Sequence, residues 1–295
     1  MDRRQITARL EKLVRNNRFT IAISFPLIGV FLLVSGREGL IPEWLAFNPY
    51  LLVFAVTVMA LPLIAGIAPI IDRKAAFGLF LLVLFTWAIE LTGVTYHIPY
   101  GEFSYQRDLG PMLPGDLAPF FSGEIPWALP IFYFPILLNG YLLAVLMLGD
   151  RSDSLYIRYP VVVALVIMLD LILDPGAVSL NFWEWNHPTE LLGWDDPGIY
   201  YGVPVMNYLG WVVSGSIAVG LIHFSFDHEK IKTRLSECEF FLDDLINFAI
   251  FWGLVNLYFG NWAAFALTLV ILTVLYRADW FDFAGIGTSN QSVSR

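Results

Sequence analysis

The chain has 295 residues, of which 57% are hydrophobic and only 15% are charged, and its formal net charge is −9 at pH 7. Soluble domains carry about 25% charged residues, so this composition excludes an ordinary soluble globular fold. The acidic balance also provides no basic face for nucleic acid. We therefore predict an all-α integral membrane protein.

Apolar runs long enough to cross a membrane recur along the whole chain. A hydrocarbon layer of about 30 Å requires about 20 residues of helix. Because the first and last runs are short, we expect seven or eight transmembrane helices in a single membrane domain, residues 1–295. The eight runs lie at residues 19–36, 49–71, 75–96, 125–149, 159–177, 203–226, 240–259 and 261–276.

Basic residues are distributed unequally between the loops that join these runs. With eight crossings and the N-terminus inside, fifteen of the 17 lysine and arginine residues lie on the inner side, and only Arg37 and Arg107 lie outside. Short loops rich in basic residues stay in the cytoplasm. We expect a multi-pass protein of the cell membrane with a cytoplasmic N-terminal segment, 1–18, and a cytoplasmic tail, 277–295. No cleavage pattern follows the first run, so we expect no cleavable signal.

Two further features of the composition concern the environment of the chain. The chain has only four lysines but thirteen arginines, and its acidic residues lie mostly in loops. Acidic surfaces stay hydrated at high salt, so the balance fits a proteome adapted to high salt and equally an acidic membrane protein of another source. The single cysteine, Cys238, excludes an internal disulfide.

Two loops on the predicted outer side are long and rich in Gly, Pro, Trp and Tyr. They cover residues 97–124 and 178–202. Irregular backbone near membrane depth survives only where protein buries it or water reaches it. We expect both loops to fold back as re-entrant or capping segments over the outer ends of the helices.

Three carboxyl groups fall inside the predicted helices. Glu90 lies about 22 Å along its helix from Ala75, and Asp170 and Asp174 lie comparably far along theirs. The two aspartates share one helix face, and Pro175 is expected to end that helix. Ionisable groups inside a bilayer usually face a bundle interior or a wet cavity. The three acids are therefore candidate catalytic residues in the outer half of the membrane.

Structural explanations compete with this interpretation. Glu90 could bind the outer loop through a hydrogen bond, and Asp174 could cap a helix end. Asn139 and Asn207 also lie in helices, where interhelical hydrogen bonding is the commoner explanation. We place these two amides beside the acids as supporting residues.

Several kinds of site lack their characteristic residues. His97, His187, His223 and His228 are scattered, which argues against the di-iron site of a membrane hydroxylase or desaturase. The segment GIGTSN at 285–290 lacks the third glycine of a dinucleotide fingerprint. A nucleophile elbow is also missing. We expect neither a metal nor a redox cofactor.

Two other classes of protein stay open. Membrane prenyltransferases hold magnesium with aspartate pairs on helices, as Asp170 and Asp174 could do. Such a site needs a second acidic cluster and basic residues, whereas Asp243 and Asp244 are expected on the opposite, inner side. A transporter or proton relay would also bury acids, but its polar residues would be strung through several helices.

Buried carboxyl groups ringed by aromatic side chains suit acid catalysis on an apolar substrate. Burial keeps a carboxyl group protonated near neutral pH, and a protonated acid can attack an alkene. Ring faces would stabilise the carbocation by about 0.5 to 2 kcal/mol per contact. The candidate substrate-binding residues are Tyr96, Tyr100, Phe103, Tyr105, Trp183, Trp185, Tyr200, Tyr201 and Trp211, with Asn139 and Asn207 beside them.

Four blocks of sequence carry a resemblance to a known family. GVTYHIPYGEFSYQRDLGPML follows Glu90, and ILLNGYLL, DLILDPGAVSLNFWEW and YYGVPVMNYLGWVVSG come after it. In order and spacing, over about residues 75–220, they resemble the carotenoid hydratase family of CruF type, and its haloarchaeal members most of all.

The resemblance implies addition of water to the terminal isoprenoid double bonds of an acyclic C50 carotenoid, which gives a tertiary alcohol at each end, as in bacterioruberin. It implies a long apolar carotenoid substrate within membrane lipid, no cofactor, and other enzymes of the pathway as candidate partners. One carboxyl group would donate the proton, and a second, ionised, would orient or deprotonate the water. We expect Asp174 or Glu90 to be the acid and Asp170 to support it.

Overall fold

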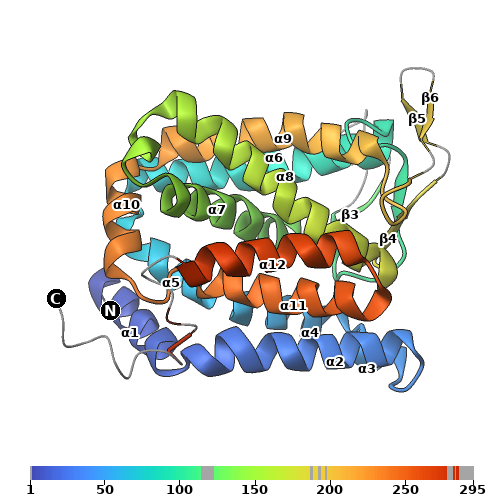
Figure 1. The fold of residues 1–295 in the computed structure, drawn as a ribbon, viewed down its shortest axis with the longest axis horizontal. Helices are drawn as coiled ribbons and strands as arrows, with labels where there is room; N and C mark the ends of the chain where they lie inside the picture. The colour runs from blue at the N-terminus through green and yellow to red at the C-terminus, as the bar shows by residue number, and fades with distance from the viewer. Residues whose placement is uncertain are drawn as a thin grey trace.

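The computed structural model describes residues 2–113, 123–186, 189–191, 194–196, 198–277, 282 and 284–285. Long helices lie side by side in one bundle, with short strands at one end and α1 and α10 at the other (Figure 1). The helices are α1 (Arg3–Asn16), α2 (Phe25–Arg37), α3 (Glu43–Ala46), α4 (Pro49–Met59), α5 (Leu61–Ile67), α6 (Arg73–Tyr96), α7 (Leu129–Leu148), α8 (Leu155–Ser179), α9 (Val205–Ser225), α10 (His228–Glu237), α11 (Asp243–Phe259) and α12 (Trp262–Arg277).

The described residues hold five helices that are long and apolar enough to cross a membrane. The spans lie at Thr20–Arg37, Arg73–Tyr96, Leu129–Asp153, Leu155–Ser179 and Val205–Ser225, and a bent pair, Glu43–Met59 with Leu61–Ile70, would make a sixth. An all-α membrane protein is therefore found. The expected count of seven or eight is not confirmed.

Local features of the sequence explain why fewer spans qualify. The run at 49–71 breaks at Ala60, where its two helices meet at 47°. Pro62 follows at once, and a proline removes a helical hydrogen bond and clashes with the preceding turn. The last two runs form α11 and α12, of 17 and 16 residues, which pack against each other as a hairpin and are shorter than a full span.

Helices α6, α7, α8 and α9 form the centre of the bundle through close contacts at small residues. A Cβ at Gly140 of α7 would lie 2.8 Å from Val166 Cγ2 of α8. Gly78 of α6 lies against Ser225 of α9 in the same way. Small residues let helix backbones approach closely in a membrane, where packing rather than the hydrophobic effect holds helices together.

Helix α8 does not end at Pro175, as the sequence predicts, but continues to Ser179. Proline cannot donate the hydrogen bond that the carbonyl of Leu171, four residues earlier, would receive. The hydroxyl of Tyr200, from the second outer loop, donates to that carbonyl at 3.1 Å. A proline is tolerated inside a membrane helix where another group satisfies the freed carbonyl, and this bond explains the extra turn.

The two long loops, 97–124 and 178–202, meet over one end of the bundle in their described parts. Strand β1 (Phe103–Tyr105) pairs antiparallel with β4 (Trp183–Trp185), with Phe103 opposite Trp185. Two further hairpins join β2 (Met112–Leu113) to β3 (Ile125–Pro126), and β5 (Thr189–Leu191) to β6 (Trp194–Asp196). The described parts of the two loops thus form one cap. Residues 114–122 of the first loop lie outside the described residues.

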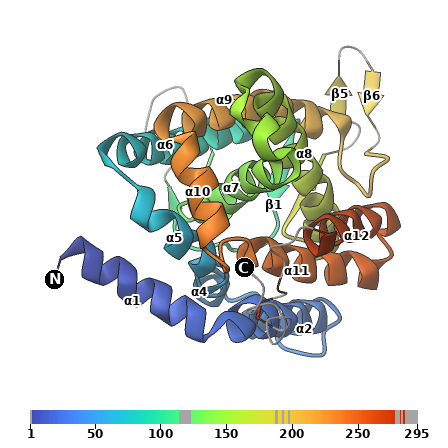
Figure 2. The ribbon, with the colours of Figure 1, turned by 60° about the vertical axis from the view of Figure 1, so that its left-hand side comes forward.

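Charged contacts tie the other end of the bundle together. Helix α10 lies across that end over α5 and α7 (Figure 2). Arg18, only 7% exposed, donates to Asp243 Oδ1 and Oδ2 at 2.8 and 2.7 Å, to Asp282 and to the carbonyl of Glu239. This network fixes the start of the first span against the start of α11.

Candidate active site

A cavity of about 280 Å³ lies beneath the cap, inside the bundle. Side chains of α2, α4, α6, α7, α8, α9 and α11 line it, together with side chains of β1 and β4 from the cap. Most of the wall is apolar. Its carboxyl and amide groups are Glu90, Asp170, Asp174, Asp244, Asn207 and Asn247.

Asp170 and Asp174 form a buried pair around one amide. They are 1% and 4% exposed on neighbouring turns of α8, and Asn207 Nδ2 of α9 donates to both, at 3.2 Å to Asp170 Oδ2 and 2.5 Å to Asp174 Oδ2. Asp170 Oδ1 is buried and accepts no hydrogen bond from the described residues. Asp170 therefore offers an oxygen that can accept a hydrogen bond from a bound molecule. It lies beside the carboxyl group of Asp174, which Asn207 fixes in place.

Glu90 forms a hydrogen bond to the cap. The sequence suggested it both as a partner of this loop and as a catalytic residue, and the two roles are compatible. The hydroxyl of Tyr105 in β1 donates to Glu90 Oε1, and both residues line the cavity. Burial, and then the charge of Glu90, raise the pKa of Tyr105 well above its usual range. The phenol therefore keeps its proton and acts as the donor. Glu90 is thus both a partner of the outer loop and a group of the cavity wall.

Aromatic rings form the outer part of the cavity wall. The ring of Phe103 lies 5.7 Å from that of Tyr105 and 6.2 Å from that of Trp185. Tyr133 stacks on Trp211 at 4.8 Å with an interplanar angle of 16°. The rings that line the cavity near the acids are those of Tyr100, Phe103, Tyr105, Tyr133, Trp183, Trp185 and Trp211.

Four of the residues suggested by the sequence lie elsewhere. Tyr96, the last residue of α6, is 47% exposed, and Tyr200 bonds to Leu171. Tyr201 turns toward α12, where its hydroxyl accepts from the amide of Ala263 at 2.9 Å. Asn139 donates to Asp244 at 2.6 Å without forming part of the cavity wall. These side chains are not placed to touch a molecule in the cavity.

Asp244 corrects an expectation from the sequence. It was expected with Asp243 on the opposite side of the membrane, away from the other acids, yet it lines the same cavity and is only 5% exposed. Asp243 turns away toward Arg18. Because α11 begins inside the bundle, its first turn delivers Asp244 and then Asn247 to the wall. The sequence analysis also did not predict Tyr133 and Asn247, which line the cavity. Both are polar residues within apolar runs, and that pattern could have identified them.

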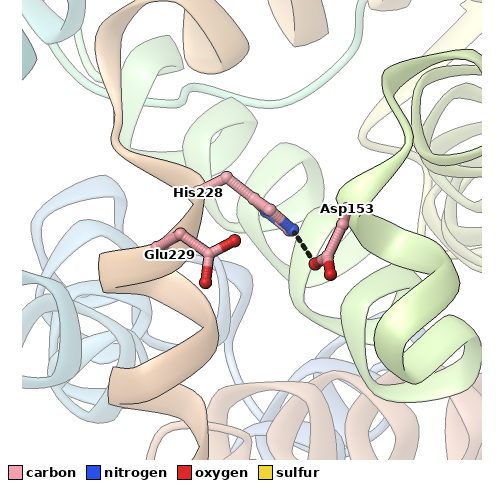
Figure 3. A group of neighbouring side chains, drawn as sticks. All are labelled: Asp153, His228 and Glu229. Atoms are coloured by element: carbon pink, nitrogen blue, oxygen red, sulfur yellow. Dashed lines mark ion pairs between the residues drawn. The ribbon is translucent and has the colours of Figure 1, made fainter.

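A second group of titratable side chains, Asp153, His228 and Glu229, lies at the opposite end of the bundle (Figure 3). Lys232 pairs with Asp153 at 2.9 Å. His228 contacts the Tyr141 hydroxyl at 3.0 Å and the Ser152 hydroxyl at 3.3 Å. Burial, and then Arg158, lower the pKa of His228. Asp153 and His228 thus have partners within the protein, so we interpret them as the link between α10 and the α7–α8 connection.

Comparison with known proteins decides the family. A family model described as a carotenoid biosynthesis protein matches residues 47–275. The chain belongs to this family. The match contains all four sequence blocks that resemble the carotenoid hydratases, so that resemblance is confirmed at family level. It also reaches beyond residue 220 and includes all of α11, with Asp244 and Asn247.

A named relative matches most of the chain. It is bisanhydrobacterioruberin hydratase of Haloarcula japonica, 46% identical over 277 residues, which cover 94% of this chain and 88% of the relative. The acidic composition of this carotenoid biosynthesis protein is consistent with a halophilic source. No solved structure matches the chain.

Proposed function

We propose that this protein is a carotenoid hydratase, which adds water to the terminal isoprenoid double bonds of an acyclic C50 carotenoid and converts bisanhydrobacterioruberin to bacterioruberin. The observation that carries the proposal is an apolar, aromatic-lined cavity in which Glu90, Asp170 and Asp174 lie together. The name of the 46% identical relative supplies the substrate class. Addition of water to an alkene needs an acid, a base and an apolar pocket, and this cavity offers all three.

The first step is protonation of the alkene. A carboxylic acid, Asp174 or Glu90, gives its proton to the less substituted carbon of the terminal double bond, and the π electrons form the new C–H bond. Positive charge is left on the tertiary carbon. Two carboxylates around one amide repel each other when both are ionised, so the Asp170–Asp174 pair is most stable with one proton. It therefore contains both an acid and a base.

Water then captures the cation. Asp170 Oδ1, a buried acceptor with no partner among the described residues, orients a water molecule and takes its proton as the C–O bond forms. The proton lost from Asp174 is thus regained by the neighbouring carboxyl group, and the pair returns to its starting state by a proton shift. Faces of Phe103, Trp183 and Trp211 stabilise the cation between the two steps. The balanced reaction consumes only water and needs no cofactor.

A membrane prenyltransferase is the alternative from the same pathway. Asp244 shares the cavity, so acids do occur on two sides of it. Binding a diphosphate also calls for lysine or arginine, since these residues contact phosphate oxygens. None lines the cavity among the residues that the structure describes, and no observation here favours the transferase.

The hydratase has one membrane domain, residues 1–295, and eight crossings. Here the pair α4 and α5 counts as one span, and α11 and α12 cross as a hairpin. Both termini are then cytoplasmic, and the cap faces outward. A cysteine placed at Glu184 of β4, in a chain whose Cys238 is replaced by serine, should react with an impermeant thiol reagent from outside. One at Ser236 of α10 should react only after the membrane is opened. The reverse pattern would invert the topology.

The direct test of the proposed reaction uses a host that makes the anhydro carotenoid. Expression of this chain should convert the pigment to alcohols that carry first one and then two additional water units, as measured by mass spectrometry. The empty vector is the control. Pigment that keeps its mass, or gains a prenyl unit, contradicts the proposal.

A further inference from the structure

Asp244, Asn247 and Asn139 form a second polar group of the bundle, which the proposed chemistry does not use. Asn139 Nδ2 donates to Asp244 Oδ2 at 2.6 Å, and Asn247 Nδ2 donates to the carbonyl of Met59 at 2.6 Å. The three side chains are 5%, 2% and 0% exposed for Asp244, Asn247 and Asn139. Asp244 and Asn247 lie in the cavity wall.

Two hydrogen-bond acceptors of the group have no donor among the described residues. Asn247 Oδ1 and Asn139 Oδ1 are both buried, and neither accepts a hydrogen bond from the residues that the structure describes. Even a protonated Asp244 has one proton to donate, so at least one amide oxygen needs a donor from outside the residues that the structure describes. An orphaned buried acceptor destabilises the protein, because it has lost its hydrogen bonds to water. A ligand that brings an O–H group into this part of the cavity would recover that loss.

The position of the group relates it to the acids under the cap. Gly140, next to Asn139, packs on Val166 of α8, which is one helical turn before Asp170 and two before Asp174. At 1.5 Å per residue, the group lies about 6 Å further from the cap than Asp170 and about 12 Å further than Asp174. A chain end can move between the two positions without leaving the cavity.

The surrounding wall defines the ligand. Met59, Phe248 and Ile136 line this region, and no basic residue does so within the described residues. A positively charged donor would have only Asp244 in this part of the wall to neutralise its charge. A hydroxyl group on an apolar chain needs no counter-charge, donates to the free acceptors and packs against the apolar wall. We propose that Asp244 and Asn247, supported by Asn139, bind the hydroxyl group of a long isoprenoid alcohol. The inference rests on the proposed function, because a hydratase meets such an alcohol as its product.

The test compares the affinities of bacterioruberin and bisanhydrobacterioruberin, which differ by the two added water molecules, one at each end. Binding is measured as quenching of tryptophan fluorescence by the polyene, with every variant on an Asp174→Asn background so that the alkene is not converted. Asn247→Leu should lower the preference for the alcohol by about tenfold, the effect of one lost hydrogen bond. Phe248→Leu, a matched change at an apolar neighbour, should leave the preference unchanged. Taking the ratio of the two affinities cancels any general damage to the cavity.

A second variant covers the case in which Asn247→Leu does not fold. Asp244→Asn places an N–H donor where the hydroxyl is proposed to bind, and should also lower the preference for the alcohol. An unchanged preference in Asn247→Leu, or in Asp244→Asn if that alone folds, would overturn the inference and mean that water alone meets these oxygens. Binding needs no turnover, so this result is separate from failure of the wild-type protein to hydrate the alkene.

Discussion

Replacement of Asp174 by asparagine is expected to lower the rate of hydration by a factor of about 10² to 10⁴, the range supplied by a positioned proton donor or acceptor. The amide keeps the size of the carboxyl group and its bond to Asn207, but it cannot deliver a proton. Asp170→Asn and Glu90→Gln should also lose most activity, because each removes a carboxyl group from the same cavity. The measurement is conversion per folded protein, with the folded amount taken from gel filtration in detergent.

Glu184 supplies the matched control for these variants. It lies on β4 between Trp183 and Trp185, but its side chain is exposed and does not line the cavity. Glu184→Gln should keep near-normal activity. If all three cavity variants convert substrate as well as Glu184→Gln does, these acids have no part in the mechanism. If they instead accumulate poorly and lose activity in proportion, their role is structural.

Arg18→Met should cost about 3–5 kcal/mol of stability, because it leaves the buried carboxylate of Asp243 without its partner. Asp243 is 1% exposed and receives two hydrogen bonds from Arg18. The midpoint of thermal unfolding in a fixed detergent measures the loss. The double variant Arg18→Met, Asp243→Leu should recover much of it, since the penalty comes from the unpaired charge rather than from the missing contact.

Arg15→Met is the matched control for Arg18→Met. Arg15 pairs with Glu239 at 2.7 Å, but the two side chains are 56% and 39% exposed. Exposed ion pairs contribute about 0–1 kcal/mol, so the unfolding midpoint should hardly move. Equal shifts for the Arg15 and Arg18 variants would contradict the account of a buried network.

The acids under the cap could be found from the sequence because the free-energy cost of a buried carboxyl group can be judged from the apolar residues next to it in the chain. A carboxyl group within an apolar run is expensive wherever the run folds, and this signal identified Glu90, Asp170 and Asp174. The composition of the loops likewise pointed to Phe103 and Trp183. The loop composition also suggested Tyr96 and Tyr201, which do not line the cavity. Composition does not specify the direction in which a side chain points.

Other features depend on contacts between segments that are distant in the sequence. Asp244 stands at the first turn of α11, where an acid is ordinary, and only the packing of that helix brings it into the cavity. Pro175 obeys a local rule that predicts a helix end, but Tyr200 supplies the missing donor from another loop. Helix number is a different case, because the bend at Ala60 has a local cause in Pro62, while α11 and α12 are held as a hairpin by packing against each other.

The most direct test of the central claim is the origin of the new hydroxyl oxygen. Purified protein in lipid, given bisanhydrobacterioruberin in water enriched in heavy oxygen and without cofactor, should form labelled monohydrated and then dihydrated products. The polyene absorption should stay unchanged, and a chelator should have no effect, because carboxyl groups alone supply and receive the proton. Oxygen derived from dioxygen, or activity lost on chelation, would contradict acid-catalysed hydration by Glu90, Asp170 and Asp174.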